Sequence, residues 1–168
     1  EQIVAKAKEL AEKINKDYHN KPLTVVCTLK GAVYFFADLM KYINIDCQFE
    51  FIKASSYIGN TTMTIGNVKI TNVMNFPIEN RDILIVEDIV DSGLTLSVIT
   101  ELLKHRGAKS VKVVTLLDKP AGRKVSFVPN YIGKTIPKAF VVGYGLDYQE
   151  LYRNLPYVGV LKPEIYKK

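Results

Sequence analysis

The apolar residues of this chain follow two alternating patterns. Apolar side chains at helical spacing predict helices at residues 2–18, 32–42 and 95–106. Aliphatic or alternating stretches predict strands at residues 23–29, 47–55, 67–72, 83–86, 111–118, 139–142 and 157–161. Because strands and helices alternate, we predict an α/β fold with a doubly wound, mostly parallel sheet, helices on both faces, and one domain over residues 1–168.

The composition bears on where the protein works. No run of eighteen apolar residues occurs, so the sequence predicts no membrane span, and its first residues lack a signal-peptide pattern. The chain does not begin with Met, and we expect a few residues to precede Glu1. Cys27 and Cys47 are isolated and lack metal-ligand spacing, which predicts reduced core thiols in a cytoplasmic protein.

The net charge of +6 fits two kinds of partner, polyanionic small molecules and nucleic acid. A nucleic-acid footprint is expected to be a clustered basic patch. Lys and Arg are instead scattered along the chain, apart from the Lys167–Lys168 tail. The charge therefore favours small anionic substrates over nucleic acid.

The segment with the clearest chemistry is ILIVEDIVDSGLT, residues 83–95. Its aliphatic start predicts a strand buried on both faces, followed by the adjacent carboxylates Glu87 and Asp88 and then by Asp91. A turn at Ser92–Gly93 opens the next helix, which is expected to stop at Gly107. The carboxylates therefore lie where open α/β sheets bind their ligands, at the carboxyl end of a strand.

A phosphorylated sugar matches these residue types. A turn over residues 91–95 directs backbone N–H groups and the hydroxyls of Ser92 and Thr95 at one point, which suits a phosphate monoester. Glu87 and Asp88 would accept sugar hydroxyls or serve as outer ligands of a hard cation such as Mg²⁺. The alternative is a solvated strand-to-helix turn in which Asp or Ser caps the helix.

This segment resembles the motif with which type I phosphoribosyltransferases bind phosphoribosyl pyrophosphate (PRPP). Over residues 23–166 the chain is similar to the hypoxanthine-guanine phosphoribosyltransferases. The similarity is carried, in order, by Leu29-Lys30-Gly31, Ser56-Tyr57, Leu116-Leu117-Asp118-Lys119, residues 140–148 (FVVGYGLDY) and Tyr152-Arg153-Asn154-Leu155. The resemblance implies the type I phosphoribosyltransferase fold, with a small hood built from the two chain ends over the base site.

The implied reaction belongs to purine salvage. The 5-phosphoribosyl group of PRPP passes to N9 of hypoxanthine or guanine, giving IMP or GMP and pyrophosphate, with Mg²⁺ as cofactor. The resemblance makes Asp91 the general base near N7 and Lys119 the donor to O6. It makes Phe140 the ring that stacks on the purine and Val141 the residue whose backbone reads the ring edge. Asp91 also has a bland alternative as the N-cap of the following helix.

The resemblance divides the PRPP contacts among several segments. The residues implied to bind the ribose and its phosphate are Glu87, Asp88, Ile89, Val90, Asp91, Ser92, Gly93, Leu94 and Thr95. The residues implied to bind pyrophosphate are Lys30, Gly31 and Arg153. A cis peptide bond is expected between Leu29 and Lys30. Asp147 is the implied direct Mg²⁺ ligand, beside the purine, with Glu87 and Asp88 as further metal residues. Ser56 and Tyr57 begin a mobile loop, which closes over PRPP and keeps water out.

Two rival functions stay open at this point. One is a relative tuned to xanthine, or to guanine over hypoxanthine, since all three bases carry the 6-oxo group that Lys119 would contact. The other is a PRPP-sensing regulator that binds nucleic acid, which would not need Asp91, Lys119 and Arg153 together. The resemblance also implies a homo-oligomer, either a dimer or a tetramer.

Overall fold

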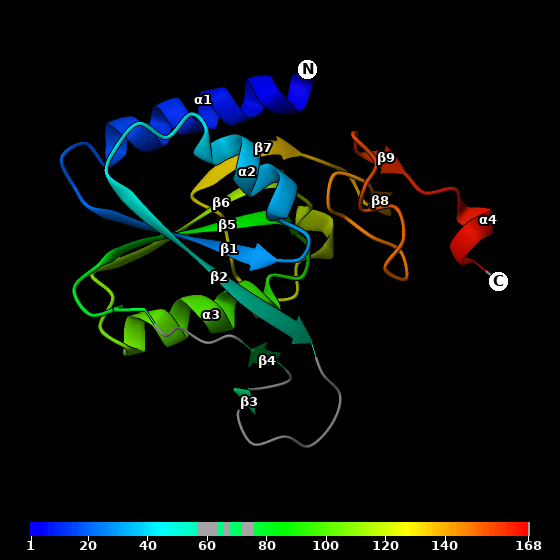
Figure 1. Cartoon of the computed structure of the whole chain (residues 1–168). Coiled ribbons are helices and arrows are strands. Elements are labelled where there is room, and N and C mark those ends of the chain that lie inside the picture. Colours follow the sequence, from blue (N-terminus) through cyan, green and yellow to red (C-terminus); the bar gives the residue numbers. More distant parts are fainter. Residues whose placement is uncertain (57–63, 66–67, 72–75, 168) are drawn as a thin grey trace.

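The computed structural model describes residues 1–56, 64–65, 68–71 and 76–167 (Figure 1). Its helices are α1 (Gln2–Asp17), α2 (Val33–Met40), α3 (Leu94–His105) and α4 (Pro163–Tyr166), with a 3₁₀ turn at Pro120–Gly122. Its strands are β1 (Leu23–Leu29), β2 (Cys47–Ser56), β3 (Thr64–Ile65), β4 (Val68–Thr71), β5 (Asp82–Val90), β6 (Ser110–Asp118), β7 (Tyr131–Thr135), β8 (Val141–Val142) and β9 (Gly159–Val160).

A seven-stranded sheet in the order β3-β4-β2-β1-β5-β6-β7 forms the centre of the molecule. The strands from β2 to β7 in this order are parallel, and β4 and β3 extend one edge with antiparallel pairing. Helices α1 and α2 cover one face and α3 covers the other (Figure 1). The predicted α/β class, with helices on both faces of a mostly parallel sheet, is confirmed.

Strand β5 lies in the middle of the sheet and is buried on both faces. Leu84 and Val86 pack into the core beneath α1 and α2, whereas Ile83 and Ile85 pack into the core that α3 covers. None of the four side chains is exposed. Burial on both faces explains why this strand is a continuous aliphatic run and not an alternating one.

Strand β5 is also longer than the aliphatic run predicted. It continues to Val90, and Glu87 and Val90 pair with Thr115 and Asp118 of β6. The prediction that the strand ends at Val86 is therefore wrong, because backbone pairing with β6 carries the ladder past the first carboxylates. Glu87 and Asp88 are therefore part of the strand, and the turn at Ser92–Gly93 follows where the sequence predicted it.

The last strand of the main sheet is not the predicted one. Residues 139–142 were expected to complete that sheet, but β8 pairs antiparallel with β9 in a separate two-stranded sheet. The sheet ends instead with β7, which the hydrophobic pattern did not predict because its sequence is Tyr-Ile-Gly-Lys-Thr. A Cβ at Gly133 would lie 2.5 Å from the Leu116 carbonyl oxygen, so glycine permits the close approach of β7 to β6.

The remaining expectations concern the helix ends, the cysteines and the membrane. Helix α3 ends before Gly107, whose φ is +87°, as the sequence predicted. Cys27 and Cys47 are free thiols, and burial, with a smaller effect of Glu87 and then Asp88, raises the pKa of Cys27 to about 12. Among the described helices, none combines the length and apolar character that crossing a membrane requires.

Candidate active site

The carboxyl end of β5 and the start of α3 form a small pocket of about 230 Å³. The predicted phosphate-binding residues gather there, and the lining consists of Glu87, Ile89, Val90, Asp91, Ser92, Gly93, Thr95 and Leu96. Two predicted members, Asp88 and Leu94, lie outside the lining, and the Leu94 side chain is exposed. The strand-turn-helix geometry of the predicted anion cradle is thus present.

Glycine opens the helix at this cradle. Gly93 is the N-cap of α3 with φ +77°, a left-handed conformation that glycine adopts without steric cost. The Leu94 N–H donates to Ser92 Oγ at 3.3 Å, and the Ser97 N–H donates to the Gly93 carbonyl at 2.9 Å. The alternative role of Asp91 as the N-cap is therefore wrong. The N–H groups of a first helical turn have no partner within the helix, so here they face the pocket mouth.

The two adjacent carboxylates have different surroundings. Glu87 Oε1 accepts hydrogen bonds from the Thr28 hydroxyl at 2.9 Å and from the Asp88 N–H at 3.0 Å. Burial and the nearby Asp88 charge raise the pKa of Glu87 well above its usual range. Asp88 turns toward the end of β1, where a Cβ on Gly31 would lie only 1.8 Å from Asp88 Oδ2. Gly31 therefore lets the predicted pyrophosphate loop lie against the acidic strand.

Asp91 and Lys119 form an ion pair at the edge of the pocket. Lys119 Nζ lies 2.7 Å from Asp91 Oδ2, and it also donates to the Ala139 carbonyl at 3.3 Å. The Lys119 side chain is 14% exposed, whereas the Asp91 side chain is 50% exposed. A carboxylate that can accept a proton thus lies beside an ammonium group that can donate to an oxygen, and their roles toward a base stay predictions.

Arg123 is a site residue that the sequence did not reveal. Its Nη1 donates to the Val90 carbonyl at 3.1 Å and to the Asp91 carbonyl at 2.8 Å, and its Nη2 pairs with the buried Asp118 carboxylate. The Lys124 N–H also donates to the Ser92 carbonyl at 2.9 Å. The loop after β6 therefore fixes the backbone of the cradle. The one available signal was the carboxylate of Asp118 at the end of an apolar strand.

Phe140 has aromatic neighbours from the C-terminal part of the chain. Its partly exposed ring stacks on Tyr166 of α4, with centroids 5.0 Å apart and planes inclined by 21°. Tyr148 contacts the same ring edge-on, at 5.7 Å. Val141 follows in β8, paired with Val160 of β9. The predicted base-stacking residue therefore belongs to a cluster of three rings, two of which the sequence did not single out.

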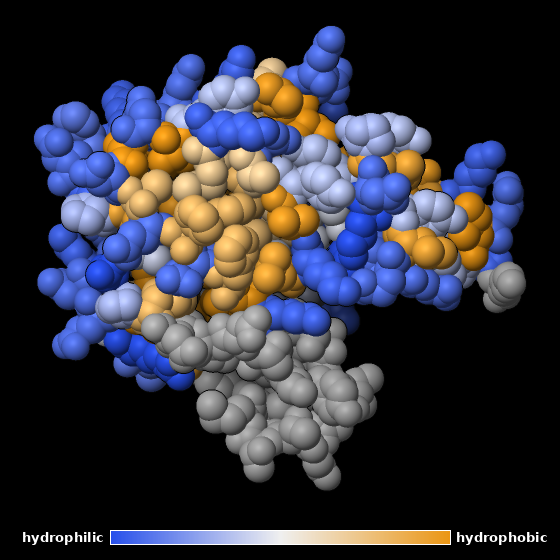
Figure 2. All heavy atoms as spheres, viewed as in Figure 1, coloured by the Kyte–Doolittle hydropathy of each residue, from blue (hydrophilic) through white to orange (hydrophobic). Residues whose placement is uncertain are grey.

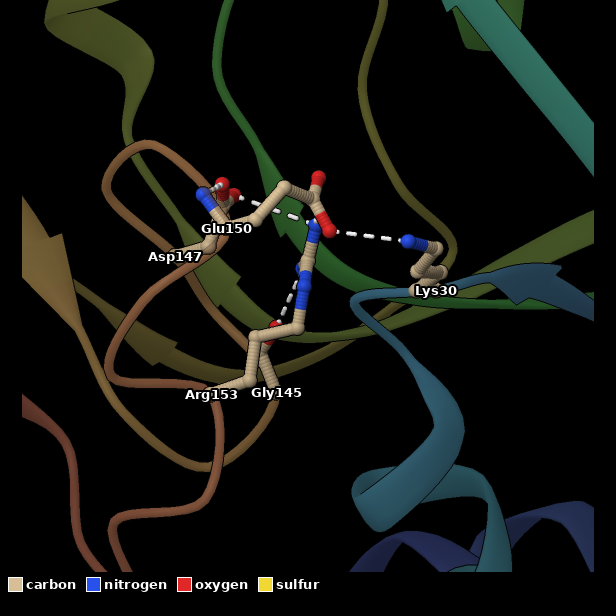
Figure 3. A network of polar contacts seen from close by, with 5 residues as sticks. All are labelled: Lys30, Gly145, Asp147, Glu150 and Arg153. Carbon is tan, nitrogen blue, oxygen red and sulfur yellow. Dashed lines mark hydrogen bonds and ion pairs between the residues drawn. The ribbon is translucent and has the colours of Figure 1, made fainter.

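The predicted pyrophosphate residues meet in a cluster of charges (Figure 3). The Leu29–Lys30 peptide is cis, which confirms the expectation from the sequence. Glu150 Oε2 lies 2.8 Å from Lys30 Nζ, and Glu150 Oε1 lies 3.0 Å from Arg153 Nη2. Arg153 Nη2 is also 3.4 Å from Asp147 Oδ1. The sequence predicted Lys30, Asp147 and Arg153 as site residues but not Glu150.

Asp147 has the surroundings of a shared metal ligand. No group of three His, Cys, Asp or Glu side chains in the described ranges is arranged to hold a metal ion by itself. Mg²⁺, however, usually binds through one or two carboxylates together with water and substrate phosphates. Asp147 is partly exposed beside Arg153, so it fits an ion that arrives with a phosphorylated substrate. Ser56 is the last residue of β2, and Tyr57 lies outside the described residues.

A parallel sheet with an anion cradle after its central strand and cations beside it defines a class of protein that handles phosphorylated sugars. Residues 1–149 match the phosphoribosyl transferase domain family, and the chain belongs to this family. It is 52% identical over 167 residues to the hypoxanthine-guanine phosphoribosyltransferase of Bacillus subtilis (strain 168), covering 99% of this chain and 92% of that protein.

Two further relatives agree with this assignment. The hypoxanthine-guanine phosphoribosyltransferase of Lactococcus lactis subsp. lactis (strain IL1403) is 54% identical over 168 residues, covering all of this chain and 91% of that protein. A crystal structure of a hypoxanthine phosphoribosyltransferase from Staphylococcus aureus superposes with a TM-score of 0.93 at 50% identity, covering 99% of this chain and 90% of that one. The likeness thus extends over nearly the whole chain.

Proposed function

We propose that this phosphoribosyltransferase is a cytoplasmic, Mg²⁺-dependent enzyme of purine salvage that takes hypoxanthine and guanine as acceptors. It transfers the 5-phosphoribosyl group of PRPP to N9 of the base and releases pyrophosphate. The observation that carries the proposal is the Asp91–Lys119 ion pair, at 2.7 Å, on the rim of the phosphate pocket. The names of the relatives support the choice of bases, and the free thiols of Cys27 and Cys47 support the compartment.

The cradle and the cations hold the two ends of PRPP. The 5-phosphate lies against the first-turn N–H groups of α3 and the hydroxyls of Ser92 and Thr95. Lys30 and Arg153 neutralise the negative charge that grows on pyrophosphate as the bond to C1 breaks. Asp147 would hold Mg²⁺, with Glu87 and Asp88 as further metal residues, and the ion would add positive charge near the leaving group.

Asp91 and Lys119 act on the purine. Asp91 lies near N7, where its carboxylate accepts the proton that the base must lose. Lys119 donates to O6 of a 6-oxopurine, and it disfavours adenine, whose 6-amino group is also a donor. Phe140 stacks on the ring, and the backbone of Val141 contacts its edge. The ion pair keeps both polar groups on one side of the base before the substrate arrives.

We infer that residues 1–168 form one domain, with a hood made from both ends of the chain. The start of α1 and the segment around β9 line a common pocket of about 640 Å³. Its lining includes Glu1, Gln2, Ile3, Lys6, Pro156, Tyr157, Val158, Gly159 and Val160. Tyr166 of α4 stacks on Phe140, next to β8, so the C-terminal segment lies at the proposed base site.

An assay of pyrophosphate release tests the proposed reaction. PRPP is mixed in turn with hypoxanthine, guanine, xanthine and adenine, with and without Mg²⁺. We expect turnover with hypoxanthine and guanine, only in the presence of Mg²⁺, and no substantial turnover of adenine. Robust use of adenine would contradict the role of Lys119. Retention on RNA or DNA at moderate salt without any transfer would favour the regulator instead.

We also propose that the protein is a homo-oligomer that associates through an aromatic patch on α2 and β2. Figure 2 shows a continuous apolar area over these two elements. The rings of Phe36, Phe49 and Phe51 pack edge to face at 5.5–5.8 Å, and Phe49 remains 55% exposed. Val33 and Tyr34 extend the exposed apolar surface. An apolar patch of this kind on a protein surface is typical of an interface.

Sedimentation of a surface variant tests this association. The Phe49→Lys substitution should shift the protein toward monomers, because it places a charge in the patch. Val128→Lys, which changes an exposed apolar residue elsewhere, is the control and should leave the oligomer intact. A monomeric wild-type protein, or an unchanged oligomer in Phe49→Lys, would contradict the proposal.

A further inference from the structure

The carboxylate of Glu150 lies between the two cations to which pyrophosphate binding is assigned. Lys30 Nζ contacts one of its oxygens at 2.8 Å, and Arg153 Nη2 contacts the other at 3.0 Å (Figure 3). Lys30 and Glu150 are 120 positions apart in the chain, so the fold and not the local sequence brings them together. An anion with two oxygens, each on one cation, has the geometry expected of one phosphate group of pyrophosphate at the same place.

The backbone directs Glu150 toward these cations. Gln149 and Glu150 both have left-handed φ angles, of +51° and +66°, and the Glu150 N–H donates to Asp147 Oδ2 at 2.9 Å. This tight turn returns the chain so that Glu150 and Arg153 face Lys30 from the same loop (Figure 3). Left-handed conformations are uncommon for residues with side chains, so this loop is a specific conformation and not an extended linker.

Arg153 has further binding capacity at this point. Its Nη1 donates to the Gly145 carbonyl at 2.6 Å, which fixes the guanidinium beside the loop. Its Nε is buried and lacks a hydrogen-bond partner within the described part of the chain. Buried donors are nearly always paired, so a free one on the guanidinium that also contacts Glu150 points to an anionic ligand with more oxygens than one carboxylate has.

We propose that Glu150 is an internal anion that occupies the pyrophosphate subsite of the free enzyme and is displaced when PRPP or pyrophosphate binds. The inference rests on the proposed function, because that function assigns Lys30 and Arg153 to pyrophosphate. Glu150 binds the two cations before substrate arrives, and it competes with the substrate for them afterwards. Its return to the cations accompanies the departure of pyrophosphate, so it lowers the affinity for this product.

The strength of the contacts agrees with a group that leaves readily. The side chains of Glu150 and Lys30 are 63% and 53% exposed, and exposed ion pairs contribute little because water screens them. After Glu150 leaves, Arg153 retains its bond to Gly145 and its contact with Asp147 at 3.4 Å. A glutamate is ionised near neutral pH, and the ion pairs with Lys30 and Arg153 favour this charged form. Displacement by a stronger anion, not protonation, removes it from the subsite.

The alternative is that Glu150 only positions the cations and does not compete. The two roles predict opposite effects when the charge is removed. If Glu150 competes for the cations, its loss in Glu150→Gln makes pyrophosphate bind more tightly. If Glu150 only positions the cations, its loss makes pyrophosphate bind more weakly. The glutamine keeps the length of the side chain and an acceptor oxygen, and the loop's backbone bond to Asp147 is unaffected.

Calorimetric titration with inorganic pyrophosphate in the presence of Mg²⁺ decides between them. We expect Glu150→Gln to bind pyrophosphate about two- to tenfold more tightly than the wild type, a range set by the modest strength of exposed pairs. The KM for PRPP should fall in the same direction, and inhibition by pyrophosphate should become stronger. The gain should shrink at high ionic strength, because salt screens the contacts of the wild-type carboxylate.

Glu101→Gln is the matched control. Glu101 pairs with Lys104 at 3.1 Å and is 61% exposed, but it lies on α3 outside the charge cluster, so its substitution should leave pyrophosphate binding unchanged. Unchanged or weaker pyrophosphate binding by a folded Glu150→Gln protein would overturn the inference. The two failures can be told apart. If Glu150→Gln binds pyrophosphate more tightly than the wild type but the wild type transfers no phosphoribosyl group to any purine, the proposed function fails while the competition by Glu150 stands.

Discussion

The two sides of the candidate site are held in different ways. On the β5–α3 side, Arg123 hydrogen-bonds two backbone carbonyls of the cradle and pairs with Asp118, whose side chain is only 6% exposed. On the opposite side, Glu150 meets Lys30 and Arg153 through ion pairs in which Glu150 and Lys30 are more than half exposed and Arg153 is 23% exposed. The first side is a fixed frame, and the second is a set of charges that can change partners.

The difference matches the tasks of the two sides. A phosphate that stays with the sugar throughout the reaction benefits from a preformed cradle, because no reorganisation is needed when it binds. The leaving pyrophosphate must be bound and then released, which weak and exchangeable contacts allow. We therefore propose that the buried hydrogen bonds to the backbone serve the retained 5-phosphate and that the exposed ion pairs serve the departing pyrophosphate.

The largest expected effect is at Asp91, the proposed catalytic carboxylate on the β5–α3 side. Asp91→Asn removes the proton acceptor but keeps the shape of the side chain, whose Oδ1 lies against Gly122. We expect kcat to fall about 10²–10⁴-fold, the usual contribution of general acid–base catalysis, with little change in PRPP affinity. Steady-state kinetics and PRPP titration measure the two. Equal losses in turnover and in PRPP binding would show that Asp91 is structural.

The next effect tests whether the fixed side depends on Arg123. Arg123→Met leaves the buried Asp118 carboxylate without its partner, so the free energy of unfolding should fall by about 3–5 kcal/mol. Urea unfolding measures this loss. Arg106→Met, at an exposed position after α3, is the control and should change stability little. A loss in Arg123→Met as small as that of the control would remove the contrast between the two sides.

A smaller effect is expected at the base-recognition cation. Lys119→Ala removes a charged donor to O6, and hydrogen bonds to charged groups are worth about 1.5–3 kcal/mol. The KM for hypoxanthine should therefore rise about ten- to hundredfold, and discrimination against adenine should relax. Competition kinetics with both bases measure the change. Full exclusion of adenine by this variant would show that Lys119 does not read position 6.

The smallest effect concerns the C-terminal aromatic ring. Tyr166→Ala removes the ring stacked on Phe140, and such aromatic pairs contribute about 0.5–1.5 kcal/mol. The KM for the purine should rise about two- to tenfold, while PRPP binding stays unchanged because the cradle is separate from this cluster. Tyr166→Phe keeps the ring and should behave like the wild type. An unchanged purine KM in Tyr166→Ala would separate α4 from the base site.

Much of the fold was predictable because the signals are local. The aliphatic run of β5, the turn at Ser92–Gly93 and the stop at Gly107 lie within a few residues of the structures they specify. β7 was missed because it is short and contains Gly133, a residue with low strand propensity. Glycine is suitable there because it permits close contact with the backbone of Leu116. The placement of β8 was wrong because an apolar tetrapeptide does not indicate which sheet it joins.

The residues of the candidate site also divide into those that local motifs predicted and those that only distant contacts reveal. Asp91 and Lys119 were identified from their motifs, and the structure brings them together at 2.7 Å, although their catalytic roles stay predictions. Arg123 and Glu150 were missed because an arginine in a loop and a glutamate near the chain end are ordinary surface residues until their partners are known. No local pattern contains those partners.

The sequence by itself determined most of the strands and helices, the turn that forms the cradle, and the kinds of functional group near it. Those features depend on hydrophobic periodicity and turn chemistry, which act over a few residues. Only the tertiary structure decided which charges meet. Parallel strands are joined by long crossovers, so groups far apart in the chain become neighbours only when the strands have paired in the correct register. Lys30 and Glu150 are one such pair, and Arg123 and the carbonyl of Val90 are another.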